Sequence, residues 1–306
     1  MLMLLAVLAF SCGPCDEETA TRGHLRVLIA ESVAPVVVQE VNRFLGLYAS
    51  HGADVKYTIM QSREINDRFV NDTARVIITT IPLTNKEKEE VRKTTDNLVE
   101  IKLAYDGVVA IVQKSNARKD FTLEQIRSIL DGRFSTWEHV GRPSLGGGRI
   151  HLYLQDSSDV SQYLAERLLD GNPINASFRR TTSSSQTVED VTRDRDAIGF
   201  VGLNWIDSVD GTIKVLSLRA DSTLADTTFR PPKESVGNAY SPHPAYIYLN
   251  YYPMKRAIYV YSRTTPGDFA TGFTSFLASP EGQRIFLNAG LVPGTQQIVL
   301  KRPDQE

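Results

Sequence analysis

The sequence contains little cysteine. Cys12 and Cys15 are the two cysteines among 306 residues, and both stand in the N-terminal segment. The rest of the chain therefore has no internal disulfide framework, and packing must stabilise the fold. An excess of positive charge is also missing, because the formal net charge is −2 and the Lys and Arg residues are scattered. Without a basic patch the chain lacks what a nucleic-acid binder needs, so we expect no nucleic acid among its partners.

Motifs of the common enzyme classes are missing as well. No Gly-x-Ser-x-Gly or Gly-x-Gly-x-x-Gly follows a predicted strand, and the glycine-rich stretch 144–149 lacks the Gly-Lys-Ser/Thr ending of a phosphate-binding loop. Five widely separated histidines lack metal-ligand spacing: His24, His51, His139, His151 and His243. We therefore expect a protein that is not an enzyme and that has no resident metal or cofactor.

The N-terminal segment 1–23 has the pattern of a targeting signal. Its apolar run, Met1 to Phe10, is too short to cross a bilayer of roughly 30 Å as a helix. Small residues then precede Cys12, which resembles the acceptor cysteine of a bacterial lipoprotein signal. The run lacks a preceding Lys or Arg, and Ala9 stands where Leu is usual. We expect lipidation at Cys12 and a membrane anchor; a plain cleaved signal and a buried N-terminal strand are the alternatives.

Strand and helix patterns alternate behind this segment. Short runs rich in branched residues predict strands at 25–30, 55–59 and 75–80, and helical spacing predicts a helix over 36–47 and a shorter one over 63–71. The alternation predicts an α/β fold with a largely parallel sheet. About 300 residues exceed the usual size of one core, so two lobes are expected. Capping patterns predict helix starts at Thr84, Thr122 and Ser135.

Six strings, in order along the chain, resemble signatures of the PstS-like family, the phosphate ABC transporter substrate-binding proteins. They are Tyr105-Asp-Gly-Val-Val-Ala-Ile-Val112, Thr122-Leu-Glu-Gln-Ile126, Phe134-Ser-Thr-Trp-Glu-His-Val-Gly141, Asp196-Ala-Ile-Gly-Phe-Val201, Tyr252-Pro-Met-Lys-Arg-Ala-Ile-Tyr-Val-Tyr261 and Phe276-Leu-Ala-Ser-Pro-Glu-Gly-Gln283. The resemblance implies a divergent member with the two-lobed periplasmic-binding-protein type II fold. Residues 24–112 and 255–306 would form lobe 1 and residues 113–254 lobe 2. Crossing strands near 106–112 and 257–261 would act as the hinge.

The resemblance also implies where a ligand binds. In this family, helix N-termini and hydroxyl-rich loops hold a tetrahedral oxyanion, because backbone N–H groups and the helix dipole both favour negative charge. The corresponding positions of this sequence are Ser32, Thr79, Thr80, Asp156, Ser158, Ser184 and Ser185. No metal is expected there.

Four positions depart from the family pattern. Glu31 stands where Ser is usual, Ile81 replaces a charged residue, Gln155 replaces Arg, and Asp159 replaces a loop glycine. Unit charges about 4 Å apart interact by about 4 kcal/mol at surface-like dielectric, so two carboxylates beside a phosphate dianion predict that tight phosphate binding is lost. The acids could instead be first-turn residues that point to solvent, or they could receive a cationic or zwitterionic ligand group.

Together these patterns predict an extracytoplasmic solute-binding lipoprotein of a phosphate-type ABC importer. It would capture a small polar or oxyanion solute between its lobes, act as a monomer and deliver the solute to an ABC permease. The alternative is a membrane-anchored sensory or interaction protein that keeps the scaffold and has lost its solute.

Overall fold

The computed structural model describes residues 18–95, 97–141, 148–206, 211–221 and 230–296. The predicted lipidation site at Cys12 and the start of the tether lie outside the described residues. Within these ranges, no helix is both long enough and apolar enough to cross a membrane.

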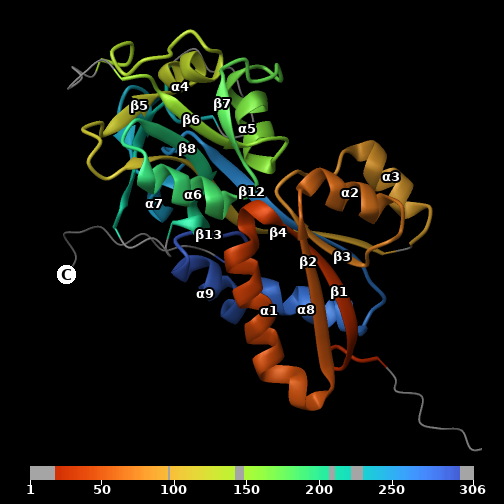
Figure 1. The fold of residues 1–306 in the computed structure, drawn as a ribbon. Helices are drawn as coiled ribbons and strands as arrows, with labels where there is room; N and C mark the ends of the chain where they lie inside the picture. Colours follow the sequence, from red (N-terminus) through yellow and green to blue (C-terminus); the bar gives the residue numbers. More distant parts are fainter. Residues whose placement is uncertain (1–17, 96, 142–147, 207–210, 222–229, 297–306) are drawn as a thin grey trace, which may run out of the picture.

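Lobe 1 is a sheet of mostly parallel strands with helices on both faces (Figure 1). Strand β1 pairs in parallel with β2 along its whole length and with β3 on its other side, as the alternating pattern predicts. The elements of this lobe are β1 (Gly23–Ala30), η1 (Glu31–Val33), α1 (Ala34–Tyr48), η2 (Ala49–His51), β2 (Ala53–Met60), α2 (Ser62–Val70), β3 (Val76–Thr79), α3 (Asn85–Arg92), α8 (Phe269–Ala278), α9 (Pro280–Asn288) and β13 (Val292–Pro293).

Lobe 2 repeats this architecture with β6, β8 and β7 in parallel and helices packed around them. A small second sheet of β11, β10 and β5 lies at its edge. The elements are β5 (Asp120–Thr122), α4 (Leu123–Leu130), β6 (His151–Gln155), α5 (Asp159–Leu168), β7 (Phe178–Thr181), α6 (Ser184–Arg193), β8 (Ala197–Gly202), η3 (Leu203–Trp205), β9 (Ile213–Val215), β10 (Ser217–Arg219), η4 (Lys233–Ser235), β11 (Ala239–Tyr240) and α7 (Pro244–Tyr248).

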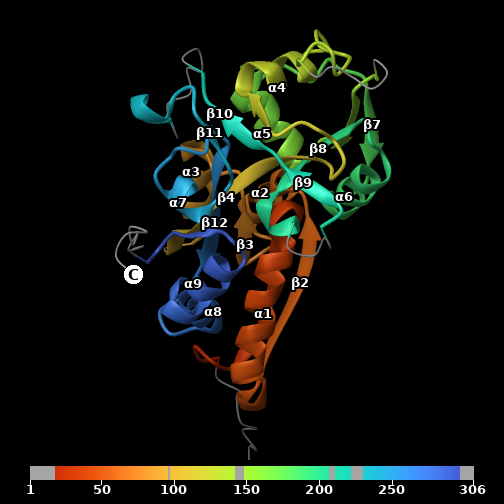
Figure 2. The same ribbon diagram turned by 90° about the vertical axis from the view of Figure 1, so that its left-hand side faces the viewer.

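Two long strands join the lobes, β4 (Leu98–Gln113) and β12 (Lys255–Arg263). The first half of β4 pairs with β12, and its second half pairs with β8 of lobe 2. The run 254–261 taken alone predicts a strand of mixed exposure. This prediction is wrong: β12 is buried throughout, because it lies between β3 and β4 inside the sheet. Both strands run through the middle of the molecule from one lobe to the other (Figure 2).

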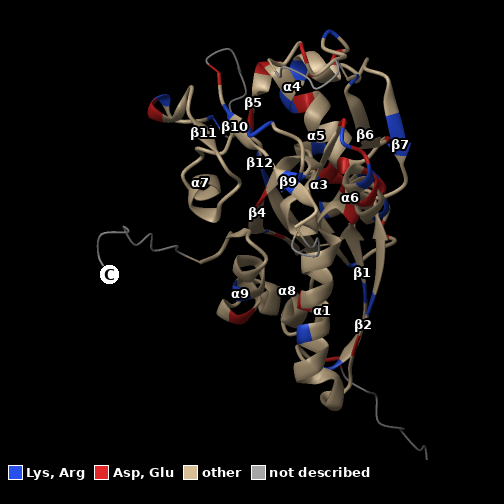
Figure 3. Cartoon of the chain, turned by 60° about the vertical axis from the view of Figure 1, so that its left-hand side comes forward, with Lys and Arg blue, Asp and Glu red and all other residues tan. Residues whose placement is uncertain are grey.

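Two separate hydrophobic cores underlie the two lobes. One packs α1, α8 and α9 against the lobe 1 strands, and the other packs α4, α5 and α6 against β6, β8 and the second half of β4. The change from one core to the other falls between Ala104 and Val108 on β4. The lobe limits given above from the sequence remain a prediction. Acidic and basic residues are interspersed along the chain in both lobes (Figure 3).

One predicted helix is wrong. Residues 135–141, expected to begin a helix at Ser135, form turns and an isolated bridge between Thr136 and Arg149. Trp137 explains the difference: its side chain is fully buried, and its indole N–H donates to the carbonyl of Asp196 at 3.1 Å. The buried Trp137 side chain anchors the segment, and the segment pairs with the chain near residue 149. These contacts take the place of helical hydrogen bonds.

Candidate functional site: an interlobe cleft closed by two carboxylates

The candidate site lies where the carboxyl ends of β1 and β2 in lobe 1 face the beginnings of α5 and α6 in lobe 2. In open α/β sheets, ligands bind at this end of parallel strands, because the loops and helix N-termini gather there. Buried polar side chains line the contact between the lobes. Their hydrogen bonds run across the cleft.

Glu31 crosses from lobe 1 to lobe 2. Its carboxylate accepts a hydrogen bond from the backbone N–H of Ser184 at 2.8 Å and another from the Ser184 hydroxyl at 2.8 Å. Ser184 is the first residue of α6, so Glu31 sits at the positive end of that helix. Burial raises the pKa of Glu31 above its ordinary value; the Ser184 hydrogen bonds oppose this shift, and the charge of Asp159 adds to it.

Asp159 makes the reverse connection from lobe 2 to lobe 1. One carboxylate oxygen accepts from the backbone N–H of Ser62 at 2.7 Å. The other accepts from the Ser62 hydroxyl at 2.8 Å and from the Ser32 hydroxyl at 3.0 Å. Ser62 begins α2, and Asp159 is only 2% exposed. Gln61 reinforces the contact, because its side-chain oxygen accepts from the backbone N–H of Asp159 at 3.1 Å.

We call this set the carboxylate latch: Glu31 with Ser184, and Asp159 with Ser62 and Ser32. Each carboxylate takes the backbone N–H and the hydroxyl at the start of a helix in the opposite lobe. Such donors are the groups that a bound oxyanion would use. The chain therefore places its own anions on them, and the two lobes are held together across the cleft.

The predicted site residues divide into three groups. Ser32, Thr80 and Ser184 converge at the cleft; Thr80 donates its backbone N–H to the Ser62 hydroxyl at 3.1 Å. Two others bond within their own segments, since Thr79 bonds to Ile81 and Ser158 caps α5 through Ser161.

The remaining two predicted residues, Asp156 and Ser185, are exposed. Asp156 forms an ion pair with Arg180 at 2.8 Å. Gln155, one of the departures from the family pattern, donates to the carbonyl of Thr182 at 3.0 Å. The role of each of these residues in ligand binding stays a prediction.

The sequence left two interpretations of the loop acids: they point to solvent, or they receive a cationic or zwitterionic ligand group. The structure adds a third, in which an acid bonds to the opposite lobe. Asp156 does face solvent. Glu31 and Asp159 do not: both are buried, and both have accepted hydrogen bonds from the protein itself. Both acids do stand in the first turn of a helix, but the alternative that they point to solvent is wrong, because each is buried and bonds to a helix of the opposite lobe.

Several residues of the cleft were missed from the sequence. Ser62 carries the same signal that marked Ser32, a hydroxyl between a strand and a helix, but it lies outside the loops that the family pattern covers. Asn204 donates to the Ser32 carbonyl at 2.9 Å. Gly202 lets that carbonyl approach, since a side chain there would place its Cβ 2.6 Å from the Ser32 oxygen. No local pattern marks Asn204.

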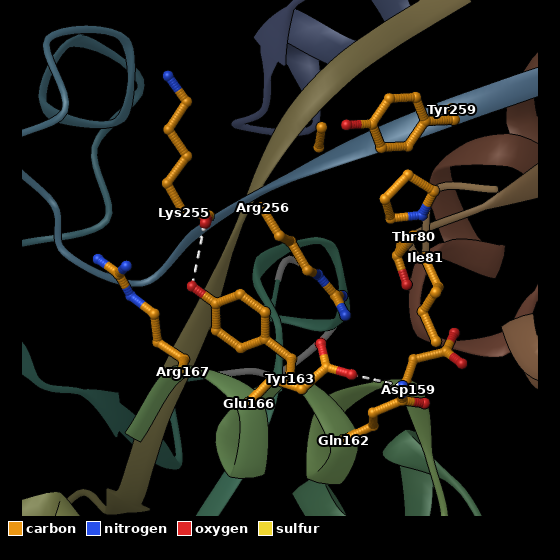
Figure 4. Close-up of a pocket in the computed structure, with 12 residues that line it drawn as sticks. Thr80, Ile81, Asp159, Gln162, Tyr163, Glu166, Arg167, Lys255, Arg256 and Tyr259 are labelled. Carbon is orange, nitrogen blue, oxygen red and sulfur yellow. Dashed lines mark hydrogen bonds between the residues drawn. The ribbon is translucent and has the colours of Figure 1, made fainter. Parts of the chain in front are cut away.

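A cavity of about 310 Å³ opens beside the latch, between α5, β12 and the loop after β3 (Figure 4). Arg256 on its wall forms a buried ion pair with Asp106, with Nη2 and Nε at 2.7 and 3.0 Å from one carboxylate oxygen. Lys255, also on the wall, has its pKa lowered to about 8 by burial, with a smaller effect from Lys102. Its ammonium group bonds to Asn250 and lies 4.0 Å from the centre of the Tyr105 ring.

Two α/β lobes, two crossing strands and a cleft lined by helix beginnings define the two-lobed class of solute-binding proteins. A family model described as the PBP superfamily domain matches residues 15–281, and the chain belongs to this family.

The chain is similar to the phosphate-binding protein PstS of Staphylococcus saprophyticus. The two are 26% identical over 188 residues, which is 60% of this chain and 57% of that protein. It is also similar to the PstS of Borreliella burgdorferi, with 23% identity over 95% of this chain and 96% of that protein.

A solved structure shows the same fold. It is that of a phosphate ABC transporter substrate-binding protein with bound phosphate from Clostridium perfringens, with a TM-score of 0.66 and 21% identity over 89% of this chain and 99% of that one.

Proposed function

We propose that this chain is an extracytoplasmic solute-binding protein of a phosphate-type ABC system whose cleft does not accept phosphate. One observation carries the proposal: Glu31 and Asp159 occupy the backbone and hydroxyl donors at the starts of α6 and α2. A phosphate ion would have to displace both carboxylates. It would then lie beside two buried negative charges, each of which repels every unit of the phosphate charge by about 4 kcal/mol at about 4 Å.

The rest of the proposal follows the resemblance to proteins named for phosphate binding and phosphate transport. We propose that Cys12 carries the lipid anchor, that the protein works outside the cytoplasm as a monomer, and that an ABC permease is its partner. Binding a solute without transforming it fits a cleft whose polar groups are hydrogen-bonded to one another. The solute would be small and polar.

The carboxylate latch also favours a second candidate, a sensory or interaction protein that has lost its solute. Hydrogen bonds between protein groups join the two lobes directly across the cleft, whereas hinged binding proteins ordinarily close around a ligand. Such a chain would present its closed surface to a partner at all times. A solute that raises the melting temperature separates the candidates, because ligands that bind only the folded state stabilise it.

Isothermal titration with phosphate tests the first proposal. The protein should give no binding heat at micromolar phosphate. The double variant Glu31→Ser with Asp159→Gly restores the residue types usual in the family and frees the donors, so it should bind phosphate at least tenfold more tightly. Glu189→Gln, an exposed change on α6 away from the cleft, is the control and should behave like the parent. Micromolar binding of phosphate by the parent would refute the proposal.

A further inference from the structure

We infer that the cavity between α5 and β12 binds a small zwitterion of the α-amino acid class. The inference rests on the proposed function and names its solute. A zwitterion carries no net charge, so it avoids the repulsion that the latch carboxylates impose on a phosphate dianion.

Arg256 supplies the site for the carboxylate of the ligand. The side chain is 3% exposed and lines the cavity. Its Nε and Nη2 atoms bond to Asp106, whereas Nη1 is buried and has no hydrogen-bond partner within the described ranges. A buried donor without a partner costs free energy, and native proteins rarely leave one. A carboxylate in the cavity would satisfy it with a charge-assisted hydrogen bond.

Glu166 supplies the site for the ammonium group. It lies on α5 on the same cavity, and its side chain is 58% exposed and therefore reachable; one of its oxygens lies 3.8 Å from Nη2 of Arg63. One of its oxygens accepts from Gln162 at 2.7 Å. Figure 4 shows Arg256 and Glu166 both pointing into the space between α5 and β12. Among the described residues, Arg256 pairs with Asp106 and not with Glu166. A cation and an anion that line one cavity and do not pair with each other are complementary to a molecule that carries both charges.

The wall also carries apolar surface that suits the body of an amino acid, beside the polar side chains of Thr80, Asp159, Gln162, Arg167 and Lys255. Ile81 and Pro82 line the cavity, as do the rings of Tyr163 and Tyr259. The Tyr163 hydroxyl is already bonded to the carbonyl of Lys255 at 3.0 Å, which fixes its ring against the cavity. A volume of about 310 Å³ is at the small end of ligand sites, as a single amino acid requires.

Thermal shift and titration of the full chain test the inference with L-leucine and L-phenylalanine as probes. Isoamylamine lacks the carboxylate of leucine, and 4-methylpentanoate lacks its amine. At least one amino acid should bind and raise the melting temperature, and the matching single-charge compound should bind at least tenfold more weakly. No binding by either amino acid would overturn the inference, as would equal binding of 4-methylpentanoate and leucine.

A variant pair locates the binding. Glu166→Gln removes the anionic partner of the ammonium group and should weaken amino acid binding at least tenfold; because this residue is half exposed, the fold should be kept. Glu189→Gln, an equally exposed helical glutamate on α6, should leave binding unchanged. Equal effects of the two would overturn the assignment. Phosphate, titrated in the same series, reports separately on the proposed function: its binding would refute that proposal whatever the amino acids do.

Discussion

Two buried glutamates nine residues apart differ in their hydrogen bonding: the carboxylate of one receives hydrogen bonds, and that of the other receives none from the described residues. Glu31, in η1, faces the start of α6 and receives two hydrogen bonds from Ser184. Glu40, inside α1, is fully buried, and neither of its oxygens has a partner within the described residues. Burial raises the pKa of both, but that of Glu40 rises from 4.5 to about 9, with a further contribution from Glu281. Glu40 is thus neutral at pH 7.

The difference follows from the donors at each place. Desolvation disfavours an ionised carboxylate wherever it is buried, and only hydrogen bonds or a positive charge can offset the cost. The cleft offers helix N-termini and hydroxyls, whereas the core of lobe 1 offers apolar side chains. Asp106 extends the comparison, because its carboxylate is fully buried and paired with Arg256. Variants at these three residues test the comparison.

The largest effect is expected at Asp106. Asp106→Asn keeps the shape of the side chain but leaves the Arg256 charge buried and uncompensated, so the free energy of unfolding should fall by about 3–5 kcal/mol. Urea unfolding at pH 7 measures it. Glu64→Gln, which breaks an exposed i,i+4 pair with Arg68, is the control and should cost under about 0.5 kcal/mol. Equal losses in the two variants would contradict the role given to burial.

Glu40 should give an effect of opposite sign. Keeping it protonated at pH 7, about 2.5 pH units above its ordinary pKa, costs about 3 kcal/mol at roughly 1.4 kcal/mol per unit. Glu40→Leu should therefore raise the free energy of unfolding by about that amount at pH 7. Gln39→Leu, on the exposed side of α1, is the matched control and should change little.

The pH dependence of the free energy of unfolding gives a second test of Glu40. Between pH 4.5 and about 9 the folded protein keeps the proton of Glu40 while the unfolded chain has lost it, so stability falls as the pH rises through this range. Glu40→Leu should remove this contribution, and the two stability curves should approach each other toward pH 4.5. Parallel curves over the whole range would contradict the neutral state assigned to Glu40.

Glu31 should show the smallest effect on stability. Glu31→Ala removes two hydrogen bonds and leaves the buried Ser184 N–H without a partner, so a loss of about 1–3 kcal/mol is expected. Glu31→Gln keeps an acceptor for that N–H and removes a charge that burial disfavours, so it should cost less than half as much. Thermal unfolding of the two variants side by side measures the difference. A larger loss with Gln than with Ala would show that the charge, not the hydrogen bonds, closes the cleft.

The fold, and the meeting of three of the predicted residues at the cleft, could be predicted from the sequence. Branched runs predicted β1 and β3, capping residues predicted the starts of α3 and α4, and Ser32, Thr80 and Ser184 do meet at the cleft. The wrong predictions came from local patterns, and contacts with residues distant in the sequence explain them. Ser135 did not begin a helix because Trp137 is buried against Asp196, and β12 is buried because its neighbours are β3 and β4.

The sequence by itself determined the alternation of strands and helices, which periodicity encodes locally. Its resemblance to the PstS-like family added the two-lobed arrangement and showed that carboxylates stand where that family has residues of an oxyanion site. Only the tertiary structure decided where the carboxylates go. Glu31 and Ser184 are 153 residues apart, and Asp159 and Ser62 are 97 apart. Each pair meets only when two separately packed lobes come together, and a hydrogen bond between them depends on positions in space that no local pattern encodes.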